Sequence, residues 1–108
     1  AVSAFESITK VCNDNQIPLF AGDRDSTARG AVAAYGLDYF MIGYTAGKKA
    51  ARILKGEDPG QVPAGLASGY SLWVSLKHAG EQGLKLPRTL IEKASDKLWD
   101  EQGQVIKP

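Results

Sequence analysis

The residues of this chain best suited to chemistry lie in the segment 17–27, with the sequence IPLFAGDRDST. The apolar run from Ile17 to Ala21 is typical of a strand that is buried on both faces of a parallel sheet. Two carboxylates, an arginine and two hydroxyls follow it at once: Asp23, Arg24, Asp25, Ser26 and Thr27. Because open α/β sheets bind ligands beyond the carboxyl ends of their strands, we expect a ligand site here.

One interpretation of this segment is catalytic. Asp23, Asp25 and Thr27 match the D-x-D-x-T pattern of haloacid-dehalogenase-like phosphatases, in which the first aspartate attacks phosphorus and the second acts as acid and base. That family also needs a later acidic pair that holds Mg²⁺ after another apolar strand. Asp96 and Asp100 lie in what we expect to be a charged helical tail with no strand before it, so the sequence does not complete the metal site.

A second group of candidate residues surrounds a predicted strand-to-helix turn. Tyr35 and Tyr39 flank the turn, where an aromatic ring can form the wall of a cleft and offer a hydroxyl. Core packing is the alternative for Tyr39, because it begins the apolar stripe of the helix. Asp38 can contact a ligand or cap that helix, and capping is the commoner role.

Alternating helix and strand patterns must position both groups. The pattern predicts, in order, a helix over 1–12, strands over 17–21 and 31–35, a helix over 39–55 that ends at Gly56, a strand over 66–75, and helices over 76–82 and 88–97. Residues 23–29 are expected to form a loop, and residues 101–108 to carry little order. This alternation predicts an α/β fold with a layered, parallel sheet.

Composition excludes several classes of protein. The 108 residues are 44% hydrophobic and 23% charged, with a formal net charge of +1, so there is no broad charged surface for nucleic acid. No apolar run approaches the roughly 20 residues of a membrane-spanning helix. Cys12 is the only cysteine and His78 the only histidine, which argues against an internal disulfide and a Cys/His metal cluster. We therefore predict neither a metal nor a cofactor.

A much longer pattern resembles a known family. Residues 17–63 and the later run SLKHAGEQGLKLPRTLIEKA are similar to the C-terminal part of ABC-transporter substrate-binding proteins of the type I periplasmic fold. More narrowly, they are similar to the subfamily associated with aromatic amino acid uptake. The matching positions in the first run are Gly30, Ala31, Ala33, Tyr35, Gly36, Asp38, Tyr39, Ile53, Leu54 and Gly56, and those in the second are Ala79, Gly83 and Pro87. Ser75 stands where the family pattern has Asn, so the side-chain hydrogen bonds of that corner are expected to differ.

The resemblance implies that these residues are the C-terminal fragment of a receptor with two lobes joined by crossing strands. It assigns residues 1–29 and 64–108 to the second lobe, and residues 30–63 to a crossing strand and helix of the first. A fragment cut in this way is expected to leave apolar surfaces unpaired, and self-association is a possible consequence.

The resemblance also implies roles for the candidate residues. Asp23 aligns with an acidic cleft position suited to pairing with a ligand ammonium, and an Asx turn within its own loop is the alternative. Arg24 is a candidate for a ligand carboxylate, with a solvated loop charge as the alternative. The full set of ligand-binding candidates is Asp23, Arg24, Asp25, Ser26, Tyr35, Asp38 and Tyr39. Trp73 and Trp99 are expected to pack, and His78 to lie at or near the surface.

The function implied is that of the non-enzymatic binding component of an ABC importer. It would bind a small solute, with an amino acid favoured, and present it to the membrane permease. Its location would be the periplasm, or the outside of the cell as a membrane-anchored bacterial lipoprotein. The alternatives are the phosphohydrolase interpretation through Asp23, Asp25 and Thr27, and a free-standing flavodoxin-like interaction domain.

Overall fold

The chain divides into two compact units. The structure, a computed structural model, describes residues 4–66, 69–94 and 97–107. The first unit contains Ala1–Gly36 and Ser71–Pro108, and the second contains Leu37–Tyr70. The chain therefore leaves the first unit after Gly36 and returns to it before Ser71.

These borders lie further along the chain than the lobe borders expected from the sequence, which were placed after Arg29 and after Pro63. The physical reason is strand pairing. Ala33 and Ala34 are in register with Phe20 and Ala21, so the backbone up to Gly36 stays with the first unit. Assigning the two units to the two lobes of a receptor remains a prediction.

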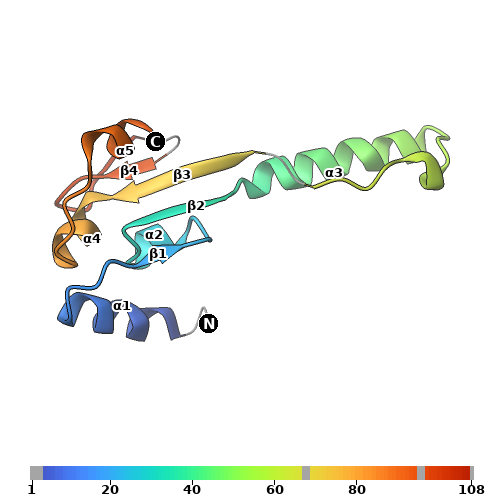
Figure 1. The fold of residues 1–108 in the computed structure, drawn as a ribbon. Coiled ribbons are helices and arrows are strands. Elements are labelled where there is room, and N and C mark those ends of the chain that lie inside the picture. The colour runs from blue at the N-terminus through green and yellow to red at the C-terminus, as the bar shows by residue number, and fades with distance from the viewer. Residues whose placement is uncertain (1–3, 67–68, 95–96, 108) are drawn as a thin grey trace. The chain divides into compact units, whose positions relative to one another are not determined.

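A mixed sheet of parallel and antiparallel strand pairs forms the centre of the first unit (Figure 1). Its strands, in the order in which they are hydrogen-bonded, are β1 (Phe20–Ala21), β2 (Ala33–Leu37), β3 (Tyr70–Ser75), β4 (Lys97–Trp99) and β5 (Val105–Lys107). β1 pairs parallel with β2 and β3 parallel with β4, while β5 pairs antiparallel with β4. The backbone N–H of Ser75 donates to the oxygen of Val32 at 2.8 Å, which joins the end of β3 to the start of β2. This confirms the predicted α/β class.

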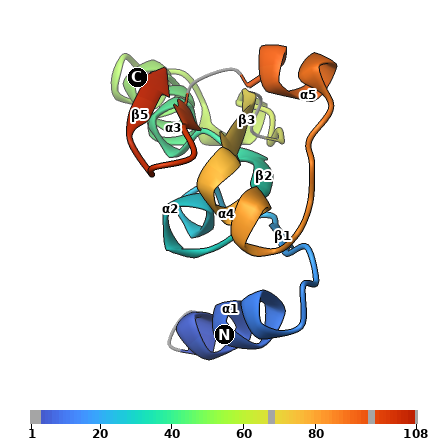
Figure 2. The same ribbon diagram turned by 90° about the vertical axis from the view of Figure 1, so that its left-hand side faces the viewer.

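The helices of this unit are α1 (Phe5–Asp14), α2 (Ser26–Arg29), α4 (Leu76–Glu81) and α5 (Arg88–Glu92). α1 and the β4–β5 hairpin lie at opposite ends of the unit (Figure 2). The apolar core gathers residues from β2, β3, β4 and the segment after α5: Ala33, Val74, Ala94 and Leu98. Partly buried hydrophobic residues pack around it, including Leu72 and Ile91.

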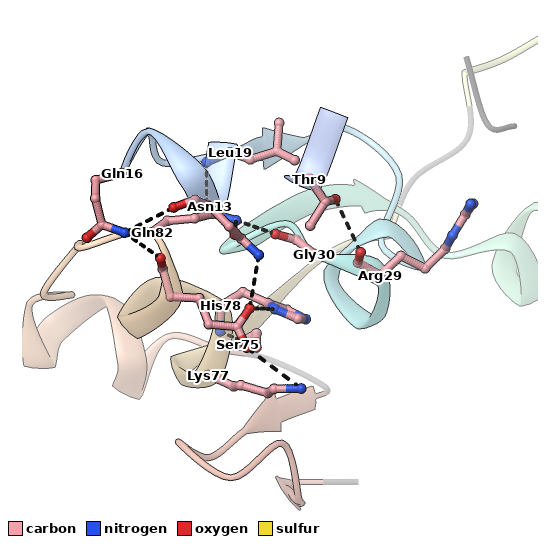
Figure 3. A network of polar contacts seen from close by, with 11 residues as sticks. Thr9, Asn13, Gln16, Leu19, Arg29, Gly30, Ser75, Lys77, His78 and Gln82 are labelled. Carbon is pink, nitrogen blue, oxygen red and sulfur yellow. Dashed lines mark hydrogen bonds and ion pairs between the residues drawn. The ribbon is translucent and has the colours of Figure 1, made fainter. Parts of the chain in front are cut away.

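A polar network holds α1, β1 and α4 together (Figure 3). Gln82, which is completely buried, uses its side-chain oxygen to accept from the N–H of Leu19 and its amide nitrogen to donate to Asn13 Oδ1 and the oxygen of Gly30. Gln16 donates to the backbone oxygen of Glu81 at 2.7 Å. Buried polar side chains are stable only when hydrogen-bonded, so these contacts fix where the three elements meet.

The second unit is built on α3 (Tyr39–Leu54), followed by a 3-10 turn, η2 (Pro59–Gln61). Asp38 caps the helix through a hydrogen bond from the N–H of Phe40 to its carboxylate at 3.0 Å, which confirms the expected start. Gly56 follows the helix with φ at 106°, as expected of a glycine just past a helix end. α3 has no buried residue, although its apolar stripe predicts tight packing. Among the described residues, no helix has both the length and the apolar character needed to cross a membrane.

The C-terminal third differs most from the sequence-based expectations. The helix predicted over 88–97 ends as α5 at Glu92, because residues 97–99 pair with β3 as β4. Residues 105–107, expected to have little order, form β5 against β4. At residues 97–99 the gain from strand pairing outweighs local helix propensity, whereas residues 105–107 become ordered because they pair with β4. A similar local difference occurs earlier, where residues 26–29 of the expected loop form the short helix α2.

Candidate functional site

The loop after β1 lies directly against the end of β2. A Cβ placed on Gly36 would be 2.6 Å from the backbone oxygen of Gly22 and 3.1 Å from Cγ of Arg24. Only a glycine leaves room for this approach. The register of β1 with β2 therefore places Asp23, between Gly22 and Arg24, at the carboxyl edge of the parallel pair. This is the edge where α/β sheets bind ligands.

Asp23 is half-buried and organises its own loop. Its Oδ1 accepts a hydrogen bond from the backbone N–H of Asp25 at 3.2 Å, which is the Asx-turn contact weighed as the alternative to a ligand role. Its side chain also lines a cavity of about 310 Å³, together with Ser26 and Arg29. Phe5 and Ile8 form part of the apolar wall of this cavity. A carboxylate that accepts a hydrogen bond from its own loop through one oxygen can still accept hydrogen bonds from a ligand.

Arg24 makes its described contacts inside the protein. Its Nη1 donates to Oγ of Ser71 at 2.7 Å, across 47 residues of sequence. Its guanidinium carbon lies 4.6 Å from the ring centroid of Trp73, within the range of a cation–π interaction. Both partners belong to β3. The structure therefore does not support the alternative that Arg24 is only a solvated charge of the loop. A contact of Arg24 with a ligand remains a prediction.

The three residues after Arg24 have different surroundings. Asp25 is exposed and precedes α2, but its side chain makes no capping hydrogen bond. Ser26 is 7% exposed and Thr27 is completely buried. The hydroxyl of Thr27 has no hydrogen-bond partner among the described residues. Of these three, only Asp25 presents its side chain freely to solvent.

Tyr35 belongs to the first unit, whereas Asp38 and Tyr39 belong to the second. The ring of Tyr35, in β2 beside Gly36, is 63% exposed. Tyr39 is 62% exposed, so the packing role that its place in the apolar stripe favoured is not seen. Asp38 has the capping role described above, and its contact with a ligand remains a prediction.

Sequence reasoning missed a cluster of rings and cations on β3 and β4. Lys97 Nζ lies 4.6 Å from the ring centroid of Trp73 and 5.9 Å from that of Trp99. The two indole rings are 5.8 Å apart at a tilt of 60°, which confirms that both tryptophans pack. Arg24, Trp73, Lys97 and Trp99 therefore form one cluster of two cations and two aromatic rings. The spacing of Lys97 and Trp99 could have indicated this cluster, because residues two apart lie on one face of a strand. The segment was predicted to be helical, so this spacing was not used.

No metal site is formed by the described residues, in which no three His, Cys, Asp or Glu side chains are grouped closely enough to hold an ion. Asp100, one of the two acidic residues considered for Mg²⁺, does follow a strand, contrary to expectation. Its Oδ1 accepts from the backbone N–H groups of Gln102 and Gln104, so it shapes the β4–β5 turn. Asp96 lies outside the described residues.

A carboxylate and other polar side chains beyond the end of a parallel strand are the arrangement of a ligand-binding α/β protein. Comparison with known families makes this specific. The family model for ABC transporter substrate binding protein matches residues 1–98. The chain belongs to this family, which confirms the resemblance drawn from residues 17–63 and the later run.

Individual relatives agree with this assignment. The chain is 40% identical over 62 residues to a protein of Clostridioides difficile (strain R20291) named tyrosine-binding protein, a match covering 57% of this chain and 18% of that protein. A conserved domain protein of Vibrio cholerae has a solved structure with a TM-score of 0.76 and 30% identity over 86% of this chain and 31% of its own.

A Streptococcus pneumoniae domain, solved in complex with L-Trp, has a TM-score of 0.71 at 22% identity and shares the fold. It aligns with 86% of this chain and 32% of its own length. The present chain thus spans about a third of the solved relatives and less of the curated ones.

Proposed function

We propose that this chain is the C-terminal part of a two-lobed receptor that binds an amino acid and delivers it to the permease of an ABC importer. The main observation in support of this proposal is the position of Asp23. Its half-buried carboxylate lies at the carboxyl edge of β1, beside the end of β2. A partly desolvated carboxylate at that position is suited to a ligand ammonium, since charge-assisted hydrogen bonds are the strong ones.

An aromatic amino acid is the favoured ligand class. The relative from Clostridioides difficile that shares 40% identity over 62 residues is named for tyrosine. The rings of Tyr35 and Tyr39 are both largely exposed, so each is available to form part of an apolar wall. The remaining polar candidates for contact with the ligand are Arg24, Asp25, Ser26 and Asp38.

The mechanism we propose is hinge closure. A ligand that contacts both lobes is bound more tightly by the closed state and shifts the population toward it. The chain passes twice between its compact units, at the end of β2 and the start of β3, so bending at these two places would accompany closure. The protein itself performs no chemical step, and it would work outside the cytoplasm, in the periplasm or as an anchored lipoprotein.

The test is ligand binding by the complete receptor. Titration calorimetry with L-tyrosine, L-tryptophan, L-leucine and L-glutamate should show binding of an aromatic amino acid. Asp23→Asn should weaken that binding by about 1.5–3 kcal/mol, the contribution of a hydrogen bond to a charged group, with little effect on stability. Asp14→Asn is the matched control, because Asp14 lies on α1 and pairs with Lys10. Equal affinities of wild type and Asp23→Asn would remove Asp23 from the site.

The same samples test the phosphohydrolase alternative when they are assayed with a phosphate ester in the presence and absence of Mg²⁺. The structure gives no support to this alternative, because the completely buried hydroxyl of Thr27 is not accessible to a phosphate. Metal-dependent phosphate release by the wild type, lost in Asp23→Asn, would overturn the receptor proposal.

A further inference from the structure

Arg24 links the loop that contains Asp23 to both places where the chain crosses between the units. Gly36 is the last residue of the first unit before the chain leaves it, and Ser71 is the first after it returns. Cγ of Arg24 lies 3.1 Å from the position of a Cβ on Gly36, and its Nη1 donates to Oγ of Ser71 at 2.7 Å. One side chain therefore contacts the end of β2 and the start of β3.

The surroundings of Arg24 restrain its side chain. Ser71 is 5% exposed, so its hydroxyl is withdrawn from water and the hydrogen bond from the guanidinium is partly buried. Trp73, two residues further along β3, has the guanidinium 4.6 Å from its ring centroid. Lys97 on β4 approaches the same ring at 4.6 Å. Partly desolvated contacts of this kind are stronger than those of an exposed arginine.

We infer that Arg24 is a positioning residue that couples the ligand-binding loop to the two crossing strands. The inference rests on the proposed function, because Asp23, its neighbour in the chain, is the proposed contact of the ligand ammonium. When Asp23 binds a ligand, the backbone of the loop is fixed, and Arg24 transmits this restraint to Gly36 and Ser71. The arginine then acts on affinity through Ser71 rather than by touching the ligand.

The first experiment needs no ligand. Hydrogen exchange of backbone amides in β2 and β3 is measured in the complete receptor for wild type, Arg24→Ala, Ser71→Ala and the double variant. Each single substitution should speed exchange by about tenfold or more, the factor that follows from losing a hydrogen bond to a charged group. The double variant should resemble Arg24→Ala, because Ser71→Ala removes a hydrogen bond that Arg24→Ala has already removed.

Arg88→Ala is the matched control, since Arg88 pairs with Glu92 on α5 and its side chain is 90% exposed. It should leave exchange in β2 and β3 unchanged. Additive effects of Arg24→Ala and Ser71→Ala, or no effect of either, would overturn the coupling through Ser71.

The second experiment adds L-tyrosine. In the wild type, ligand should slow exchange in β2 and β3, and this slowing should disappear in both Arg24→Ala and Ser71→Ala, with affinity reduced to a similar extent in each. A purely structural role would change stability but leave the ligand-induced slowing in place, which would overturn the inference. Loss of affinity in Arg24→Ala alone would identify a direct ligand contact, and would overturn it too.

Failure of the proposed function gives a different result. If no amino acid binds to the wild type, the receptor proposal and the ligand coupling fall together. The exchange data without ligand would still show whether Arg24 and Ser71 act as one unit in holding the crossing strands.

Discussion

The side-chain oxygen of Gln82 accepts a hydrogen bond from the backbone N–H of Leu19 at 2.7 Å, and so joins the end of α4 to the residue before β1. The amide nitrogen of the same side chain donates to Asn13 and Gly30 at 3.0 and 2.7 Å. A side chain with no exposure thus satisfies three groups that lie 52 to 69 residues away from it in the sequence.

Replacing Gln82 should destabilise the first unit. Gln82→Leu leaves the N–H of Leu19 and the oxygen of Gly30 without their partner, and each such buried group costs about 1–3 kcal/mol. We expect the free energy of unfolding, measured in urea, to fall by about 2–4 kcal/mol, given that these costs add only in part. Gln102→Leu, at an exposed glutamine of the β4–β5 turn, should change it little. Equal stabilities of the two variants would contradict the network.

Gly36 should not tolerate a side chain. A methyl group there would meet the backbone oxygen of Gly22 at 2.6 Å, and backbone atoms cannot move aside as a flexible side chain can. Gly36→Ala should therefore cost about 1–3 kcal/mol, as overpacking does. The control is Gly22→Ala in the facing loop, where a Cβ would meet nothing within 4 Å. Thermal unfolding of both variants checks the difference, and a neutral Gly36→Ala would show that the loop does not lie against β2.

Substitutions of Asp38 separate its two candidate roles. Asp38→Ala removes the cap of α3 and should lower stability by about 0.5–2 kcal/mol, whereas asparagine can cap nearly as well as aspartate. Asp38→Asn should therefore keep the helical signal in circular dichroism. If Asp38 also contacts a ligand ammonium, Asp38→Asn should weaken amino acid binding in the complete receptor while stability stays the same. Unchanged affinity would leave capping as its role.

The ion pair of Arg52 and Glu57 predicts a pH effect at the end of α3. Two hydrogen bonds of 2.6 Å from the guanidinium lower the pKa of the Glu57 carboxyl below its ordinary value. A lowered folded-state pKa means that the pair stabilises the helix end above the unfolded pKa, and that this contribution is lost as the pH falls through the folded pKa. An NMR titration of Glu57 should show the low pKa, and Arg52→Gln should return it toward the ordinary value. The same pKa in both proteins would contradict the pairing.

The chain made without further receptor segments should self-associate. Phe40 and Leu54 on α3 are 74% and 87% exposed, and large exposed apolar surfaces favour association. Sedimentation velocity should detect species heavier than the 11.5 kDa chain, and Phe40→Glu with Leu54→Glu should reduce them. A monomer that unfolds in one sharp transition would contradict this expectation.

Features that depend on neighbouring residues could be predicted from the sequence. The start of α3 at Asp38 and its end before Gly56 follow from capping and backbone preference, which act within one turn of helix. The family assignment and the polar loop after β1 were likewise readable, because both rest on the order of residues along the chain. The roles of Asp23 and of the other candidate ligand contacts remain predictions.

Tertiary structure alone decided what depends on distant partners. Residues 97–99 form β4 because β3 offers them a strand to pair with, an interaction that helical periodicity does not record. Arg24 donates a hydrogen bond to Ser71, 47 residues away, and the partners of Gln82 lie up to 69 residues away. A sequence lists the donors and acceptors but not the distances between them, and hydrogen bonds form only within about 3.5 Å, so the fold had to bring them together first.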